Sequence, residues 1–200
     1  MFPLALYPYP DFKKQIKFSS NSKTILKTNG KPDILYSGAI VNGTGIHEFL
    51  VEFCNSKISN YYQLVICGKG LFPKKFKKYL NNKNVQFLGY ISNDKLHKIS
   101  SNCSAFINPR LTSNKDWLNN FPSKVLGYLT YDSPTFSTLT ENLHPDLYDL
   151  IIPYKLVDDI LEALLNEKLI LEHVNLLKSK RSLFTWEKAV KKILEEVSLI

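Results

Sequence analysis

The sequence has little arginine, and this shortage bears on the partners it is suited to. Arg110 and Arg181 are the only arginines among 200 residues, although the formal net charge is +8. The charge therefore comes almost wholly from lysines, which are spread along the chain. Proteins that bind nucleic acid more often carry a dense basic stripe with arginine or interleaved aromatic side chains. We therefore expect no nucleic-acid partner.

Cysteine is also scarce, and its pattern argues against a metal site. The three cysteines form no C-x-x-C pair and have apolar neighbours, which is typical of reduced, buried thiols. The histidines show no metal-ligand spacing either, and we expect each of them at the surface or at a helix edge. These histidines are His47, His97, His144 and His173. We predict neither a metal nor a cofactor.

Long apolar runs are absent as well. No stretch of about 18 apolar residues is present to cross a membrane, and the start of the chain has neither the apolar length nor the basic residues of a signal peptide. With 44% hydrophobic residues, a chain of 200 residues can bury a substantial core. The sequence predicts a globular, cytoplasmic protein, with peripheral attachment to the inner face of the membrane as an option.

The prediction of peripheral membrane attachment depends on the densest basic cluster in the chain. Lys74, Lys75, Lys77 and Lys78 surround Phe76 on a short amphipathic segment. One interpretation is the solvated face of a helix. A second is a surface that approaches anionic phospholipid, or the phosphates of a lipid-linked substrate, and it predicts peripheral membrane contact. Nucleic acid is the remaining interpretation of this cluster.

The chain divides into two regions. Residues 1–31 hold several prolines and a polar stretch, which predict an irregular leading segment or interdomain linker. Over residues 32–200, strand-like apolar runs alternate with helical patterns. We expect strands at 34–40, 63–67, 85–88, 103–108, 135–137 and 150–152, and helices at 45–56, 72–81, 93–101, 121–130, 157–165 and 184–197. The predicted fold is an α/β, Rossmann-like parallel sheet with helices on both faces.

In such a sheet, ligands bind beyond the carboxyl ends of the strands. The loop after the first strand holds Gly38, Thr44 and Gly45, and its glycines allow backbone amides to approach a phosphate at a helix N-terminus. The loop after the second strand holds Gly68 and Lys69, where a backbone and a cation can meet the same ligand. The alternative for both loops is that the glycines only allow tight turns and bind no ligand.

The loop after the third strand runs through Gly89, Tyr90 and Ile91. A serine and an asparagine follow, and either of them can cap the next helix whatever the protein does.

The loop after the fourth strand carries the strongest candidates. The planar guanidinium of Arg110 suits a phosphate or carboxylate better than lysine does, with an exposed ion-pair member as the alternative. Lys124 lies in the first turn of the following helix, where the helix dipole disfavours a cation unless an anion is present. Together with the neighbouring Ser123, these residues predict an anion site.

These loops resemble the donor-binding half of retaining GT-B glycosyltransferases, the large glycosyltransferase 4 family. The resemblance extends over about residues 32–198 and rests on four runs in the family's order: Cys67-Gly-Lys-Gly70, Phe87-Leu-Gly89, Phe121-Pro-Ser-Lys124 and Phe184-Thr-Trp-Glu187. It implies that the glycine loops, Lys69, Arg110, Ser123 and Lys124 hold the donor diphosphate. It also implies that the residues from Gly89 to Ile91 contact the nucleobase through backbone groups.

The chain departs from the family pattern at four positions. Ala39 and Thr44 stand where relatives carry two cations against the donor diphosphate. Asn119 and Gly127 stand where relatives carry the two glutamates of a Glu-x7-Glu pattern, the second of which accepts hydrogen bonds from the donor ribose. The resemblance therefore implies weak or differently arranged donor binding.

The resemblance covers one half of a GT-B enzyme. It implies binding of a nucleoside-diphosphate sugar and transfer with retention, without a required metal, in the synthesis of cell-surface polysaccharide or glycolipid. An amino-terminal glycosyltransferase half on a separate chain would complete the site. The alternative is a degenerate, non-catalytic domain that acts as a scaffold or is a non-functional fragment.

Overall fold

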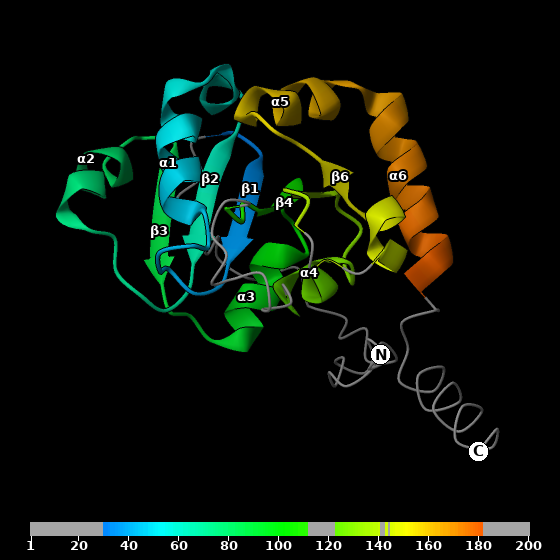
Figure 1. Cartoon of the computed structure of the whole chain (residues 1–200), viewed down its shortest axis with the longest axis horizontal. Helices are drawn as coiled ribbons and strands as arrows, with labels where there is room; N and C mark the ends of the chain where they lie inside the picture. Colours follow the sequence, from blue (N-terminus) through cyan, green and yellow to red (C-terminus); the bar gives the residue numbers. More distant parts are fainter. Residues whose placement is uncertain (1–29, 112–122, 141–142, 144, 182–200) are drawn as a thin grey trace, which may run out of the picture.

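The computed structural model describes residues 30–111, 123–140, 143 and 145–181. Four expectations lie outside these residues: the segment before residue 30, Asn119, His144 and the helix at 184–197. The described residues form a six-stranded sheet in the order β3-β2-β1-β4-β5-β6, with every pair of neighbours parallel. The strands are β1 Asp33–Ser37, β2 Gln63–Cys67, β3 Val85–Gly89, β4 Ala105–Asn108, β5 Thr135–Ser137 and β6 Ile152–Pro153 (Figure 1).

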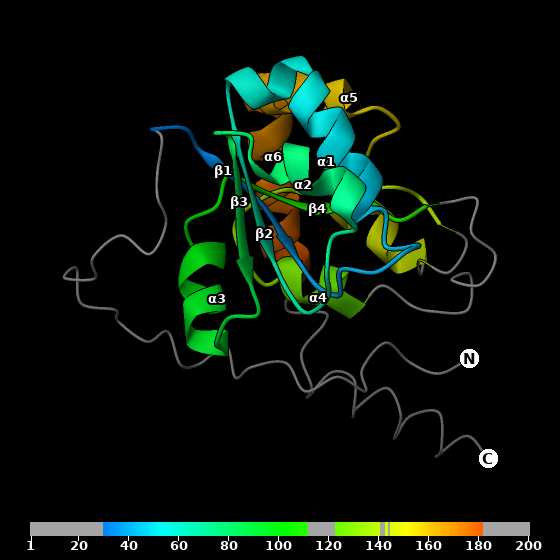
Figure 2. The ribbon, with the colours of Figure 1, turned by 90° about the vertical axis from the view of Figure 1, so that its left-hand side faces the viewer.

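Helices connect the strands and cover the sheet. The α-helices are α1 Ile46–Asn55, α2 Lys77–Leu80, α3 Asn93–Ser100, α4 Ser123–Tyr128, α5 Val157–Leu165 and α6 Glu167–Lys180. Short 3₁₀ helices span Lys57–Asn60, Lys74–Phe76 and Pro145–Leu150. Figure 2 shows α3 on one side of the sheet and α1 and α5 on the other. The prediction of a Rossmann-like sheet with helices on both faces is confirmed.

The core follows the alternation of side chains along the strands. In β1, Ile34 and Tyr36 face the cluster that includes α1 and α5, whereas Leu35 faces the cluster that includes Ile99 of α3 and Tyr128 of α4. The central strands β2 and β4 are buried along their whole length, as the runs without polar alternation predict. A third cluster joins α4 to Leu177 of α6 beyond β5 and β6.

Several boundaries differ from the sequence prediction, including those of β1, α2 and β6. β1 ends at Ser37 because the loop begins at Gly38, and only an isolated bridge between Ile40 and Gly70 continues the pairing. The helix expected at 72–81 consists of a 3₁₀ turn and the single α-turn of α2. The last strand begins at Ile152, since a 3₁₀ helix ends at Leu150.

One helix, α6, is not predicted from the sequence. Leu177 is its one fully buried residue, while Leu169, Leu171 and Leu176 are exposed. The apolar residues of α6 therefore do not form the single stripe that identifies an amphipathic helix.

Of the two places expected for the histidines, the surface is wrong for His47, which lies in the first turn of α1. His47 is only 3% exposed, and its ring packs 5.1 Å from the ring of Phe72 and 4.9 Å from that of Phe76, measured between centroids. The sequence did not reveal this because both phenylalanines lie in the segment after β2, which folds back over α1. Burial lowers the pKa of His47, which favours the neutral ring.

Candidate functional site

The strand order reverses between β1 and β4, and the candidate site lies at their carboxyl ends. Both neighbours of β1 in the sheet, β2 and β4, are parallel to it, so the loops that follow these strands emerge at one edge. An open α/β sheet binds its ligands where the strand order changes direction. The loops singled out from the sequence therefore gather at the expected place.

Two of these loops touch at Gly45, the residue before α1. Its φ is 74°, and a Cβ atom there would overlap the carbonyl group of Pro109. Both the left-handed backbone and the close approach require glycine. The loop after β1 is thereby held against the residues that lead to Arg110.

The loops after β2 and β3 join the same array through backbone hydrogen bonds. The N–H of Gly38 donates to the carbonyl of Cys67 at 3.0 Å, and the N–H of Gly68 donates to the carbonyl of Gly89 at 2.8 Å. A Cβ atom at Gly68 would overlap the carbonyl of Gly38. Gly38, Gly45, Gly68 and Gly89 thus belong to one array of closely packed loops.

Lys124 reaches this array from the first turn of α4. Its Nζ lies 4.1 Å from the centroid of the Tyr36 ring, and a Cβ atom at Gly38 would lie 3.5 Å from the same nitrogen. The Tyr36 hydroxyl donates to the carbonyl of Ala39 at 2.6 Å, which fixes the ring under the lysine. The ammonium group therefore sits at the end of β1.

Arg110 places a second positive charge beside Lys124. Its side chain is largely buried, with 8% of its surface exposed. Burial and then the charge of Arg110 lower the pKa of Lys124 to about 7. Within the described residues, no ion pair joins Lys124 to a carboxylate. A largely buried arginine beside a partly buried lysine makes a site that an anion would stabilise.

Thr44 lies inside the loop after β1. It is buried, and its hydroxyl donates to the carbonyl of Val41 at 2.8 Å. Burial raises the pKa of the nearby Tyr36 to about 12, against smaller opposing effects of Thr44 and Arg110. Thr44 thus supports the loop and borders the site, and Tyr36 is a neutral phenol over the working pH range.

The remaining predicted residues lie at the margin of the array. Lys69 is exposed and contacts the ring of Tyr90, with its Nζ 4.8 Å from the ring centroid. Tyr90 is 70% exposed, whereas Ile91 packs partly against the α3 side of the core. Ser123 is exposed at the start of α4. The structure therefore brings Lys69 to Tyr90 at the third loop.

Tyr36 and Tyr128 were not identified from the sequence as residues of this region. Tyr36 stands within an apolar strand and Tyr128 within an apolar helix, where aromatic residues are expected to be core. Their hydroxyl groups are the signal that sequence reasoning missed, because a buried tyrosine normally requires a hydrogen-bond partner.

Gly127 faces solvent on α4. It lies four residues after Ser123, so the two occupy the same face of the helix, and no atom lies within 4 Å of the position that a Cβ would take. A larger side chain therefore fits at Gly127, and the glycine is not required by packing.

Neither a metal centre nor a membrane span is found in the part of the chain that the structure describes. No group of three or more His, Cys, Asp or Glu residues is placed there to hold a metal ion. No helix in these residues is long and apolar enough to cross a bilayer. The three cysteines are free thiols, with Cys67 and Cys103 buried and Cys54 half-buried.

Comparison with known proteins identifies a family and a fold. The model of the family described as glycosyl transferases group 1 matches residues 17–146. No curated protein sequence matches the chain.

Solved structures share the fold at low identity. TarM is 14% identical with a TM-score of 0.64, over 82% of this chain and 34% of TarM; a TarM variant from S. aureus was solved with fondaparinux, alpha-GlcNAc-glycerol and UDP. Sucrose-phosphate synthase from Thermosynechococcus elongatus is 15% identical, with a TM-score of 0.63 over 85% of this chain and 46% of that protein. The lipopolysaccharide outer core galactosyltransferase WaaB is 15% identical, with a TM-score of 0.60 over 86% and 50%. The chain spans between about a third and a half of these proteins.

Proposed function

Because the chain belongs to the glycosyl transferases group 1 family, we propose that it is the carboxyl-terminal, donor-binding domain of a retaining GT-B glycosyltransferase. Its ligand is a nucleoside-diphosphate sugar. The observation that carries the proposal is the position of Lys124, whose ammonium lies against Tyr36 and beside the like charge of Arg110. A diphosphate at this point would offset both the cost of removing the Lys124 ammonium from water and its repulsion by Arg110.

The chemistry of transfer suits two neighbouring cations. When the bond between the sugar's anomeric carbon and the phosphate oxygen breaks, the bonding electrons leave with the oxygen, and negative charge grows on the departing nucleoside diphosphate. Arg110 and Lys124 stabilise that charge without a metal ion. The amino end of α1, preceded by Gly45, adds backbone N–H groups and the positive end of the helix dipole.

Family membership supports an assignment of the other loops. We propose that the diphosphate lies along Gly38, Thr44, Gly45 and Gly68, with Lys69 and Ser123 at its margin. The nucleobase would then lie against the backbone from Gly89 to Ile91.

We also propose the setting in which the domain works. Transfer needs an acceptor site and catalytic groups, which we expect from an amino-terminal half on a separate chain. The pathway would be the synthesis of cell-surface polysaccharide or glycolipid, in the cytoplasm or at the inner face of the membrane. A pull-down with a tagged form of this chain would capture that half, and its absence would contradict the two-chain arrangement.

A titration tests donor binding directly. Calorimetry and thermal shift with UDP, GDP and UDP-sugars, with and without magnesium, should reveal one preferred nucleotide whose binding does not require the metal. Arg110→Gln should reduce its affinity about tenfold or more, because a charged hydrogen bond contributes about 1.5–3 kcal/mol. Lys57→Gln removes the same charge from an exposed position and should leave the affinity unchanged.

A second candidate function is a non-catalytic scaffold. Gly127 favours it, because that position lacks the carboxylate with which relatives hold the donor ribose. A chain that is folded by circular dichroism but binds none of these nucleotides would support the scaffold and exclude the donor site.

A further inference from the structure

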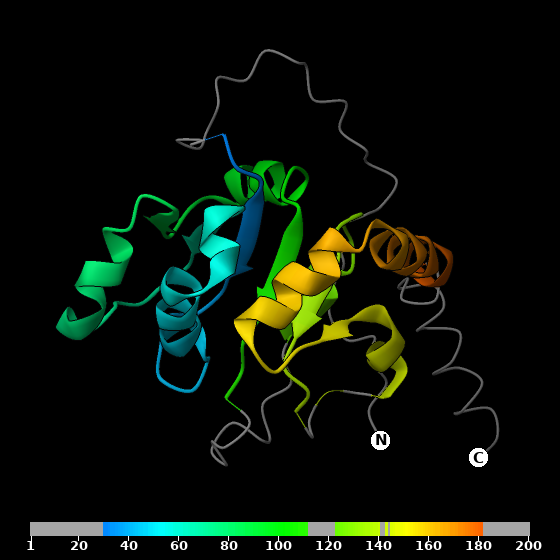
Figure 3. The same ribbon diagram turned by 90° about the horizontal axis from the view of Figure 1, so that it is seen from above.

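A basic surface lies apart from the candidate donor site. It is defined here as the Leu71–Lys78 surface, and it follows β2 on the path to β3. Its four lysines are all exposed, and Leu71 is 84% exposed. Figure 1 and Figure 3 both place α2, which carries part of this surface, at the outer flank of the molecule beyond α1.

The surface is amphipathic, and its apolar side fixes its shape. Phe72 and Phe76 are buried against the ring of His47 on α1. The Cys54 thiol of α1 also contacts the carbonyl of Tyr79, at 3.7 Å. A single helical turn is marginal on its own, so these contacts hold the segment and direct its lysines outward.

Nothing within the segment neutralises the lysines. Residues 69–83 contain no aspartate or glutamate. Within the described residues, no ion pair joins Lys74, Lys75, Lys77 or Lys78 to a carboxylate. Glu48 of α1 acts in the opposite direction to Lys75 on the pKa of the buried His47. The surface therefore presents concentrated positive charge and, at Leu71, an exposed aliphatic side chain.

We infer that the Leu71–Lys78 surface docks on anionic phospholipid. The lysines meet the phosphate headgroups, and Leu71 enters the boundary between headgroups and acyl chains. The exposed Leu71 adds an aliphatic side chain to the lysines, which favours a phospholipid surface over a purely solvated face. Nucleic acid fits less well, because Phe76 is packed inward at 7% exposure and the surface contains no arginine. This inference does not depend on donor binding.

The expected loss of vesicle binding can be calculated for each lysine that is replaced. A lysine near an anionic membrane surface changes the binding constant about fivefold. Lys74 and Lys77 are the appropriate pair, because Lys75 and Lys78 also lie over the rings of Phe76 and Tyr79. Lys74→Gln with Lys77→Gln should therefore weaken vesicle binding about twenty-five-fold.

Vesicle sedimentation tests the inference with the full chain. The protein should bind vesicles of equal parts phosphatidylglycerol and phosphatidylcholine but not vesicles of phosphatidylcholine alone. The matched control is Lys57→Gln with Lys155→Gln, which removes the same charge from exposed positions outside the surface. Leu71→Asn should weaken binding at high salt, where the aliphatic contribution remains.

The outcomes are distinct. Loss of binding in the Lys74 and Lys77 variant, with binding retained in the control, supports the inference. Equal loss in both variants would show that net charge alone is responsible and would overturn it. So would failure to bind anionic vesicles, or tighter binding to a single-stranded oligonucleotide that depends on the same lysines. UDP affinity should be measured on every variant as well. Vesicle binding that changes while UDP affinity stays the same concerns this surface alone, whereas a chain that binds vesicles but not UDP would contradict only the donor site.

Discussion

The hydroxyl group of Tyr128 hydrogen-bonds both backbone groups of Ser37. It accepts from the Ser37 N–H at 2.8 Å and donates to the Ser37 carbonyl at 2.9 Å. Tyr128 also stacks on Phe106 of β4, with 4.6 Å between ring centroids. One side chain of α4 thereby fixes the helix to the end of β1, one turn from Lys124.

We predict that Tyr128→Phe destabilises the protein by about 1–3 kcal/mol, because it leaves backbone groups of Ser37 without their partner. Urea unfolding measures the change. Tyr131→Phe is the matched control, since its hydroxyl bonds the exposed His97 at 2.9 Å and its loss should cost less than about 1 kcal/mol. Equal losses in the two variants would contradict a special role for Tyr128.

Lys124→Met should separate stability from ligand binding. The folded pKa of Lys124 is lowered from 10.5 to about 7, so below about pH 7 the fold holds a charged group that it disfavours. Methionine should therefore raise the free energy of unfolding by about 1–3 kcal/mol near pH 6, and this gain should shrink as the pH rises from about 7 towards 10.5. Nucleotide binding should be lost. A destabilised variant at that pH would show that the fold does not disfavour the charged form of Lys124.

The same group predicts a pH dependence of nucleotide affinity. An anion beside Lys124 favours the ammonium form, so its pKa rises when the ligand binds. Above about pH 7 the free protein must take up a proton on binding, and the affinity should fall as the pH increases. Calorimetry in buffers of different ionisation enthalpy measures this uptake near pH 8. Binding near pH 8 without proton uptake would contradict the role of Lys124 at the anion site.

The fold follows from the sequence to a large extent, because buried parallel strands leave apolar runs and intervening helices leave periodic ones. The carboxyl-end loops, and with them Arg110 and Lys124, could therefore be placed in advance. The packing of Phe72 and Phe76 on His47 could not, since it depends on a segment folding back over α1. The contact between Lys124 and Tyr36 could not be foreseen either, because a side chain's neighbours across elements are a tertiary property.

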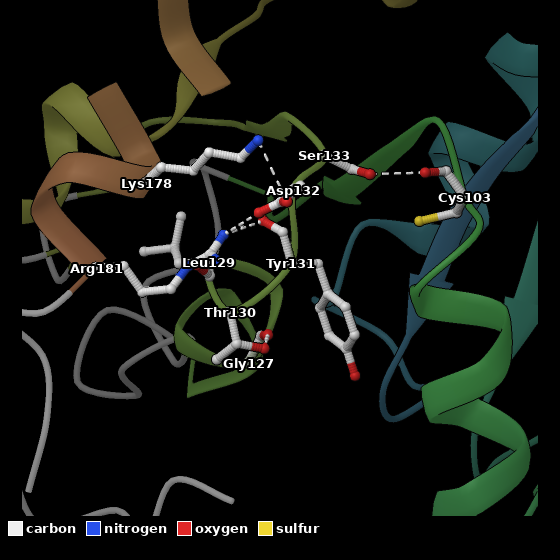
Figure 4. Close-up of polar contacts among 9 residues, drawn as sticks. All are labelled: Cys103, Gly127, Leu129, Thr130, Tyr131, Asp132, Ser133, Lys178 and Arg181. Atoms are coloured by element: carbon white, nitrogen blue, oxygen red, sulfur yellow. Dashed lines mark hydrogen bonds and ion pairs between the residues drawn. The ribbon is translucent and has the colours of Figure 1, made fainter. Parts of the chain in front are cut away.

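Arg181 shows the same limit, because the sequence gives no role to the chain's second arginine. It follows α6 and donates to the carbonyls of Leu129 and Tyr131 at 3.3 and 2.8 Å, and to the carboxylate of Asp132 at 2.8 Å (Figure 4). These bonds join the end of α6 to the chain after α4.

We predict that Arg181→Gln costs about 1.5–3 kcal/mol of stability in chemical unfolding, because charged hydrogen bonds to backbone carbonyls are lost. Lys178→Gln is the control. Lys178 also pairs with Asp132, at 3.4 Å, but both side chains are about half exposed, and its loss should cost less than about 1 kcal/mol. A larger effect at Lys178 would show that the ion pair, and not the carbonyl contacts, holds the two segments together.

Gly127 offers a gain-of-function test of the donor site. The position is exposed, its surroundings are open, and its carbonyl already accepts from the Thr130 hydroxyl at 2.7 Å, so a new side chain disturbs no contact (Figure 4). Gly127→Ala should stabilise the helix by up to about 1 kcal/mol without changing nucleotide affinity.

Gly127→Glu should add a carboxylate on the face of Ser123 that can accept hydrogen bonds from a ribose, and UDP should bind about tenfold more tightly, as measured by calorimetry. Gly127→Gln keeps the size and removes the charge, so it should give a smaller gain. Equal affinities in the alanine, glutamine and glutamate variants would mean that this face of α4 does not reach the nucleotide, and the assignment of the ribose to it would be withdrawn.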